Sequence, residues 1–477
     1  MGGGRSPSTR PCDWPISSEP AGTLRFDHYR RSRSPRLTKV ITKSGRRALA
    51  AAAIFHVILT LSVFSLGRLG VTPQKFDSDG IGEFAKDSRG HKAGVDSLVS
   101  LLKQGAMRSW VNSGEPLHVK VYSLGAVLVE PLLDSNILAA EPVNLFCYLA
   151  ILVLTFILGR IVAGERAAWL AALVVGIWPS LLLHTTQFLR DPLVLTAALT
   201  IMTVLVILLQ RDVNWPRATG IVLAGVVAIF LVWHTRPEIW LVITAIVFAA
   251  TGLLLIKIVF TRKLLPVNLL AMASLAVLSI AMPRPAVGVV SLPLTSSPAS
   301  PGSTASSAPS IASRVAIARN KFMVEGRNVS GSLIDDDVVF SSSGDVIRYI
   351  PRALEIGYLA PFPSMWFKSG YSVGLLGRVI SGLETTLTYL IEILACIFVW
   401  RHKGEFGAWL LVLATVLGMV ALGLVVANLG TLYRMRYPFW ILLVIMGVGS
   451  LVDLYKPRTF VRKNDLEHVS CRRRPRR

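Results

Sequence analysis

The stretch TQFLRDPLVLTAALTIMTVLVILL, residues 186–209, decides what kind of fold this chain can adopt. A polar turn that holds Arg190 and Asp191 leads directly into an apolar run, 192–209, that contains no charged side chain. A helix needs about 20 apolar residues to cross the hydrocarbon core of a bilayer, which is about 30 Å thick. The stretch therefore predicts a transmembrane helix with an aspartate at its start, at the membrane surface.

Similar apolar runs recur along the chain and predict about ten transmembrane helices. With 52% hydrophobic and only 16% charged residues, the composition excludes an ordinary soluble domain. We therefore expect an all-α polytopic membrane protein. The predicted spans are 48–67, 143–159, 167–188, 192–209, 218–235, 239–256, 264–282, 383–400, 407–427 and 437–454.

Positive charge is concentrated at the two ends of the chain. Of the 50 Lys and Arg residues, eleven precede Ala48 and nine follow Tyr455. Lys and Arg are retained on the cytoplasmic side of a membrane, so residues 1–46 and 456–477 are predicted to be basic cytoplasmic tails, the first of them disordered. No basic stretch carries the interleaved aromatic residues that stack bases, so we expect no nucleic-acid partner. The four cysteines lack the spacing of a disulfide framework or a zinc site.

One weaker apolar segment, 119–133, decides the topology. It is short for a span and contains Lys120 and Glu130. Counting it would give eleven spans and place the basic C-terminus outside. Treating it as a helix that lies on the outer surface keeps the basic turns between spans on the inside with both termini. The positive-inside rule favours this second arrangement.

The ten-span topology assigns the remaining segments to the outer face. Within the long outer loop, 284–313 is rich in Ser, Pro and Ala and predicts a loosely extended tether, whereas 314–366 regains apolar residues and predicts a small ordered cap. The chain then divides into a membrane core at 47–282, the outer loop at 283–381 and the last three spans at 382–455. The outer segments are the first loop 68–142, the turns 187–191 and 234–238, the loop 283–381 and the turn 428–438.

The outer face carries acidic residues that could do chemistry. Asp77 and Asp79 lie early in the first loop, and Asp191 lies at the second outer turn. Carboxylates brought together at a membrane surface can act as general bases or can hold a divalent cation. Structural interpretations remain open beside these. Asp191 followed by Pro192 is also a favourable helix start, and Asp77 and Asp79 could be turn residues.

Arginines accompany these acids at the outer turns. Arg190, Arg236, Arg434 and Arg436 present planar forks of donors suited to phosphate oxygens. Arg434 and Arg436 could instead be interfacial anchors. Glu384 lies within the eighth span, where a charged group is costly, so it either lines the site or pairs within the bundle.

The order of these features resembles the GT-C fold membrane glycosyltransferases that use lipid-phosphate sugars. That group includes the dolichyl-phosphate-mannose protein mannosyltransferases, the aminoarabinose transferases and the rhizobial galacturonosyltransferases. The order is a cytoplasmic anchor, an outer loop with an early Asp, a surface helix, and a pair of spans ending in an outer Asp, and it covers about 48–260. The local matches are Asn144, Gly164-Glu-Arg-Ala-Ala168 and Trp178-Pro-Ser180, with looser support from 358–363 and 433–438. Trp178-Pro179 also predicts a kink.

The resemblance implies a function and roles for the acids. Asp79, or Asp77 if the register is shifted, would be the catalytic base, and Asp191 would be the second-loop acid. The donor would be a sugar on polyprenyl or dolichyl phosphate, and the acceptor would be a glycan, a lipid or a protein. In this chain Gly80 follows Asp79 where the family often has Glu. The expected location is a bacterial inner membrane, in which a multi-pass protein contacts membrane lipids.

Two other classes remain open at this stage. A polysaccharide polymerase or ligase of the O-antigen type would depend more on Arg than on Asp and would use diphosphate-linked oligosaccharides. A transporter is less favoured, because charges are sparse within the spans and no pair of broken helices occurs in matching halves.

Overall fold

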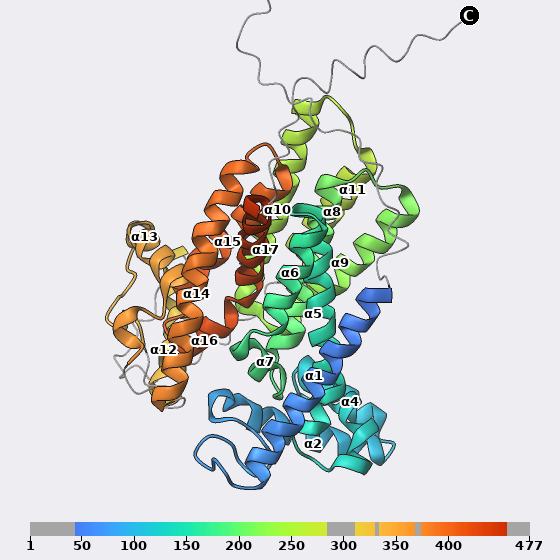
Figure 1. The fold of residues 1–477 in the computed structure, drawn as a ribbon, viewed down its shortest axis with the longest axis vertical. Coiled ribbons are helices and arrows are strands. Elements are labelled where there is room, and N and C mark those ends of the chain that lie inside the picture. The colour runs from blue at the N-terminus through green and yellow to red at the C-terminus, as the bar shows by residue number, and fades with distance from the viewer. Residues whose placement is uncertain (1–42, 284–310, 330–332, 368–373, 456–477) are drawn as a thin grey trace, which may run out of the picture.

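The computed structural model describes residues 43–283, 311–329, 333–367 and 374–455 (Figure 1). Within these residues the chain is helical and forms no β-strand beyond two isolated bridges, Phe76 with Gly82 and Leu333 with Asn428. The predicted tails at 1–46 and 456–477 and the predicted tether at 284–313 lie almost wholly outside the described residues. The protein is an all-α polytopic membrane protein.

Eight helices are long and apolar enough to cross a membrane, or nine if one bent pair counts as a span, among the described residues. The bent pair is α6 (Glu165–Gly176) with α7 (Pro179–Thr185), which turn by 64° at the Trp178-Pro179 break. The eight helices are α1 (Lys43–Arg68), α5 (Glu141–Val162), α8 (Asp191–Gln210), α9 (Trp215–Thr235), α10 (Trp240–Thr261), α14 (Gly374–Arg401), α15 (Phe406–Val425) and α17 (Tyr437–Tyr455).

The remaining predicted span, 264–282, corresponds to α11 (Pro266–Ala281), which has only 16 residues and is shorter than a full crossing. The expectation of ten spans is therefore high by one or two when judged by helix length. The bend between α6 and α7 confirms the predicted kink at Trp178-Pro179. The helix breaks there because Pro179 has no N–H to continue the hydrogen bonding of α6.

The core of the bundle is formed by α8 and α17. Figure 1 shows α17 in the middle, between α14 and α15 on one side and α5 and α6 on the other. Close approach depends on small residues: a Cβ built on Gly447 of α17 would lie 2.8 Å from the Ile391 carbonyl oxygen of α14. In contrast, α1 lies at the periphery and exposes Ile54, Phe55 and Ile58, as expected of a helix that faces lipid.

The first loop folds into a small helical layer across one end of the bundle. It contains η2 (Glu83–Ala85), α2 (Asp87–Lys103), α3 (Met107–Asn112), α4 (Leu117–Leu133) and η3 (Ile137–Ala140). The segment predicted to be a surface helix is α4, which packs on α2 and leaves Leu124, Leu128 and Leu132 exposed in one stripe. We call the end of the bundle that this layer covers the loop end.

Other predicted outer segments meet the first loop there. The turn after α7 supplies the Phe188 carbonyl oxygen, which accepts a hydrogen bond of 2.8 Å from His91 Nδ1 of α2. The short helix α16 (Leu429–Met435) precedes α17 and contacts α2 through Arg434. The residues before α10 form η4 (Pro237–Ile239), whose Glu238 pairs with Lys321 at 3.0 Å. The predicted outer turns thus gather at the same end, as the span order requires.

The predicted cap region contains two helices and a short turn. Its elements are α12 (Ile311–Val329), α13 (Ser343–Leu359) and η5 (Pro363–Met365). Arg319 of α12 is 1% exposed and donates to the carbonyl oxygens of Leu424, Ile334 and Asp335. The Asp335 carboxylate in turn accepts two hydrogen bonds of 2.9 Å from Arg352. These bonds fasten the cap to the end of α15.

Candidate functional site

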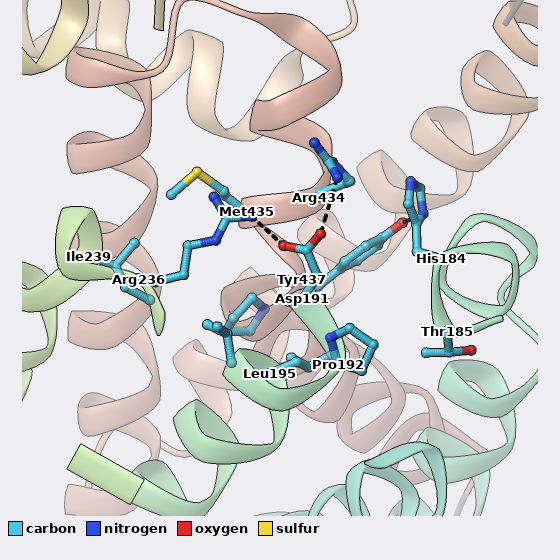
Figure 2. A pocket seen from close by; sticks show the side chains of 12 residues that line it. His184, Thr185, Asp191, Pro192, Leu195, Arg236, Ile239, Arg434, Met435 and Tyr437 are labelled. Atoms are coloured by element: carbon cyan, nitrogen blue, oxygen red, sulfur yellow. Dashed lines mark hydrogen bonds and ion pairs between the residues drawn. The ribbon is translucent and has the colours of Figure 1, made fainter. Parts of the chain in front are cut away.

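Asp191 is the centre of a buried ion-pair cluster at the loop end (Figure 2). It is the first residue of α8, and Pro192 follows at a position where a missing N–H costs nothing. Its carboxylate accepts one bond from Arg236 Nη2 and lies 3.3 Å from Arg434 Nη1. The side chains of Asp191 and Arg236 are only 10% and 3% exposed, so water screens this pair little.

Positive charge is crowded around this one carboxylate. Arg190 adjoins the pair, and the charge of Arg236, followed by burial, lowers the pKa of Arg190 to about 10. Nη1 of Arg236 is buried and has no hydrogen-bond partner. Both ring nitrogens of buried His118 are also without partners, and burial with the charges of His91, Arg190 and Arg236 lowers its pKa to about 3. Buried donors are normally paired, so this cluster has capacity for an additional anion.

Arg434 connects Asp191 to a second carboxylate, Asp87. Its Nη2 donates to Asp87 of α2 at 3.0 Å, while Nη1 faces Asp191. Burial would raise the pKa of Asp87, but the charge and hydrogen bond of Arg434 outweigh it and hold that pKa below its usual value. The first loop, α8 and α16 are thereby joined through one guanidinium.

A narrow pocket opens beside Asp191. The free space accommodates about one water molecule, because the two guanidiniums lie against the carboxylate. A larger ligand would need to displace at least one of them. The pocket is lined by His184, Thr185, Asp191, Pro192, Val194, Leu195, Arg236, Ile239, Arg434, Met435, Tyr437 and Pro438.

The wall of the pocket formed by α7 is held in place by Glu384. This glutamate of α14 is 3% exposed and accepts a bond of 2.8 Å from the backbone N–H of Ser180 and another from the Tyr433 hydroxyl. The Trp178-Pro179 break leaves the first N–H groups of α7 without partners in the helix, and the carboxylate supplies one. Glu384 therefore pairs within the bundle and does not line the pocket.

Arg436 is likewise placed away from the pocket. Its guanidinium donates to the Ala360 carbonyl oxygen and lies 4.4 Å from the centre of the Tyr433 ring. It is 3% exposed and links α16 to the end of α13. Of the four arginines expected to bind phosphate, Arg236 and Arg434 line the pocket, Arg190 adjoins them, and Arg436 does not.

Asp77 and Asp79 occupy the outer surface of the first loop and do not line the pocket. Asp77 accepts from the backbone N–H groups of Asp79 and Ile81, at 3.1 and 2.9 Å, and pairs with Arg89. Asp79 is 41% exposed and lies 3.3 Å from Lys92. The carboxylate of the first loop that reaches the Asp191 cluster is Asp87.

The glycine after Asp79 has a steric cause. Gly80 has a positive φ of 80°, and a Cβ there would lie 2.7 Å from the Ile137 side chain and 3.0 Å from the Phe64 Cα. An acidic side chain at this position would require the first loop to move away from α1. The departure from the Asp-Glu pattern is therefore part of how this loop packs.

The residues around Asp191 suit an anion better than a divalent cation. Among the residues that the structure describes, no group of three His, Cys, Asp or Glu side chains is placed to hold a metal ion. The nearest side-chain partners of Asp191 are guanidiniums, which would repel a cation. The expectation of a divalent cation shared by Asp191 finds no suitable set of ligands around that carboxylate.

Sequence reasoning did not single out Asp87, His184 or Tyr437. Asp87 is an ordinary first-turn acid of α2, and no pattern separates it from Asp79. His184 carried a usable signal, because a histidine inside a predicted span is costly unless it faces a cavity or a partner. Comparisons with protein-family models, curated proteins and solved structures gave no match for this chain.

Proposed function

We propose that this protein is a membrane glycosyltransferase that moves a sugar from a polyprenyl-phosphate donor to an acceptor hydroxyl at the loop end. The observation that carries the proposal is the convergence of Arg190, Arg236 and Arg434 on Asp191 at the start of a membrane span. The phosphate of a lipid-linked sugar lies at the membrane surface, because the lipid chain remains in the bilayer. The start of a membrane span is therefore a position that this phosphate can reach.

The donor phosphate would compete with Asp191 for the arginines. Arg434 and Arg236 form planar, charge-assisted bonds that the two free oxygens of the donor's phosphodiester can accept as well as a carboxylate can. The unpartnered Nη1 of Arg236 provides one more donor. A phosphate bound there would open the narrow pocket by drawing a guanidinium away from Asp191.

The transfer step would leave charge where the arginines lie. The acceptor oxygen forms a bond to the anomeric carbon, the bond from that carbon to the phosphate oxygen breaks, and polyprenyl phosphate departs with the electron pair. Buried donors aimed at the phosphate stabilise this developing charge. Asp191, with its fixed position at the start of α8, would orient the arginines as the donor binds.

Transfer in proteoliposomes tests the proposal. Wild-type protein is supplied with a panel of radiolabelled sugars on polyprenyl monophosphate together with membrane lipid and glycan extracts, and a covalent product is expected. Arg434→Gln should lose transfer, whereas Arg166→Gln, an exposed arginine at the opposite end of the bundle, should retain it. Movement of donor across the membrane without any product would favour a transporter and contradict the proposal.

One feature favours the alternative of a polysaccharide polymerase or ligase. Three arginines lie beside the pocket, and a diphosphate has more oxygens to accept their hydrogen bonds than a monophosphate has. Binding of farnesyl phosphate, farnesyl diphosphate and farnesol to the purified protein separates the two. A preference for the monophosphate supports the transferase, and a clear preference for the diphosphate favours the alternative.

A further inference from the structure

The transfer proposed above releases a proton from the acceptor hydroxyl, and a group that lines the pocket has to accept it. The titratable side chains that line the pocket are His184, Asp191, Arg236, Arg434 and Tyr437. Arginines are already fully protonated, and a neutral tyrosine is a proton donor. Asp191 and His184 are the remaining candidates.

Asp191 is poorly placed to act as the base. Both of its oxygens are engaged by guanidiniums, from Arg236 and from Arg434, and opposite charges at this range favour the ionised form over the protonated one. Asp77 and Asp79, expected from the sequence to be the base, are held by Arg89 and Lys92 outside the pocket.

The hydrogen bonds of His184 fix which ring nitrogen carries the proton. Nδ1 lies 2.5 Å from the Ser180 carbonyl oxygen. A carbonyl oxygen only accepts, so Nδ1 bears the hydrogen and Nε2 of the neutral ring bears a lone pair. Nε2 has no hydrogen-bond partner among the residues that the structure describes.

The ring is held in this orientation by aromatic neighbours from two other elements. Phe84 of η2 packs edge-on at 5.4 Å between ring centres, and Tyr437 does so at 5.9 Å. The Tyr437 hydroxyl lies 3.0 Å from Ser180 Oγ and 3.2 Å from Nδ1. Because Nδ1 is already a donor, the hydroxyl donates to Ser180 Oγ, and the lone pair of Nε2 stays available.

We infer that His184 is the general base of this pocket and takes the acceptor proton on Nε2 during transfer. This inference rests on the proposed glycosyltransferase function. The acceptor O–H bond breaks, its proton forms a bond with Nε2, and the oxygen forms its bond to the anomeric carbon as polyprenyl phosphate leaves. The resulting imidazolium shares the pocket with Asp191, whose negative charge favours it, and with Arg434, whose positive charge opposes it and drives the proton onward once the acceptor bond has formed (Figure 2).

His184→Asn tests the inference because it separates the two nitrogens. The Asn side-chain amide can still donate to the Ser180 carbonyl oxygen, but it supplies no base at the position of Nε2. The transfer rate should fall by about 10²–10⁴-fold, with the KM for the donor unchanged and without the loss of rate at low pH that protonation of His184 causes in wild type. Added imidazole should partly restore transfer in His184→Ala, which a purely structural role would not allow.

The matched control is His234→Asn, an exposed histidine at the end of α9 whose ring packs on the rings of Phe230 and Trp233. It should transfer at the wild-type rate. Transfer by His184→Asn at that rate would overturn the inference, and loss of transfer in Asp79→Asn alone would return the base to the first loop.

A second measurement is independent of transfer. ¹⁵N NMR of histidine-labelled protein reports the ring tautomer, and the His184 signal is the one that is missing from His184→Asn. The Nδ1-protonated tautomer is expected, and an Nε2-protonated ring would overturn the inference whether or not a donor is found. Absence of transfer from every donor, together with the expected tautomer, would count against the glycosyltransferase function and against His184 as its base.

Discussion

Arg434 bridges Asp87 and Asp191: its Nη2 lies 3.0 Å from the Asp87 carboxylate and its Nη1 lies 3.3 Å from the Asp191 carboxylate. A guanidinium can bridge two carboxylates because its donors are fixed in a plane. The bridge ties the first loop to the start of α8, so the geometry of the pocket depends on a residue of α16.

Replacing Arg434 by Lys tests whether this bridge matters for anion binding. An ammonium group keeps the charge but cannot hold both carboxylates with the same geometry. Farnesyl phosphate should bind about tenfold or more weakly to the variant, as expected for loss of one charge-assisted hydrogen bond. Titration by calorimetry measures this, with Arg166→Lys as the control. Equal affinity in Arg434→Lys would mean that the phosphate binds elsewhere.

Gly80→Ala should loosen the first loop. A methyl group there meets Ile137 and the Phe64 backbone in a left-handed conformation, whereas Gly70 has a similar φ of 63° with nothing within 4 Å. Gly70→Ala should therefore cost about 1–2 kcal/mol for the backbone conformation alone. Gly80→Ala should cost about 1–3 kcal/mol more for the contacts. Thermal unfolding in detergent gives both values, and equal costs would contradict the close packing around Gly80.

The pH dependence of stability should reveal the pair of Asp87 with Arg434. The pKa of Asp87 is lower in the folded protein than its usual value of 3.8, so its contribution is complete above that value and is lost as pH falls through the folded pKa. The difference in unfolding temperature between wild type and Asp87→Asn should be constant from pH 7 to about pH 5 and should shrink below it. A difference that instead grows with acidity would show that Asp87 is not paired.

His118 should make the protein less stable in mild acid. Its pKa of about 3 lies below the usual 6.5, so the unfolded chain takes up a proton at this site before the folded protein does, and stability falls as pH drops from 6.5 towards 3. In His118→Phe this decline should be shallower, and in His234→Phe it should match wild type. Unfolding temperatures between pH 7 and pH 4 measure it, and parallel curves for all three proteins would exclude a buried neutral His118.

Hydropathy was sufficient to predict most of the bundle. A span has to satisfy its own backbone hydrogen bonds and bury or shield apolar side chains, so long apolar runs and their order are visible in the sequence. Asp191, Arg236 and Arg434 meet because each lies at the end of a span on the same face, and the number of spans between them fixes that face. The predicted bounds of α11 and α14 were less accurate, because hydropathy marks apolar residues and does not mark helix ends.

Side-chain pairing at the loop end could not be predicted in the same way. Arg434 and Arg436 are two residues apart at the end of a short helix, so their side chains point in nearly opposite directions. Which of them faces Asp191 depends on the rotation of α16, and the sequence does not encode that in any local pattern. Likewise, Asp79 and Asp87 are both loop acids, and only the packing of α2 decides that Asp87 meets Arg434.

The 64° break between α6 and α7 separates two tasks that a straight span would have combined. The long helices can pack against lipid and against one another, while about two turns of helix in α7, held by Glu384, form one wall of the pocket beside Asp191. Substitutions along α7 can therefore change the shape of the pocket wall, and the hydrogen bonds of Glu384 with Ser180 and Tyr433 carry their effect to α14 and α16.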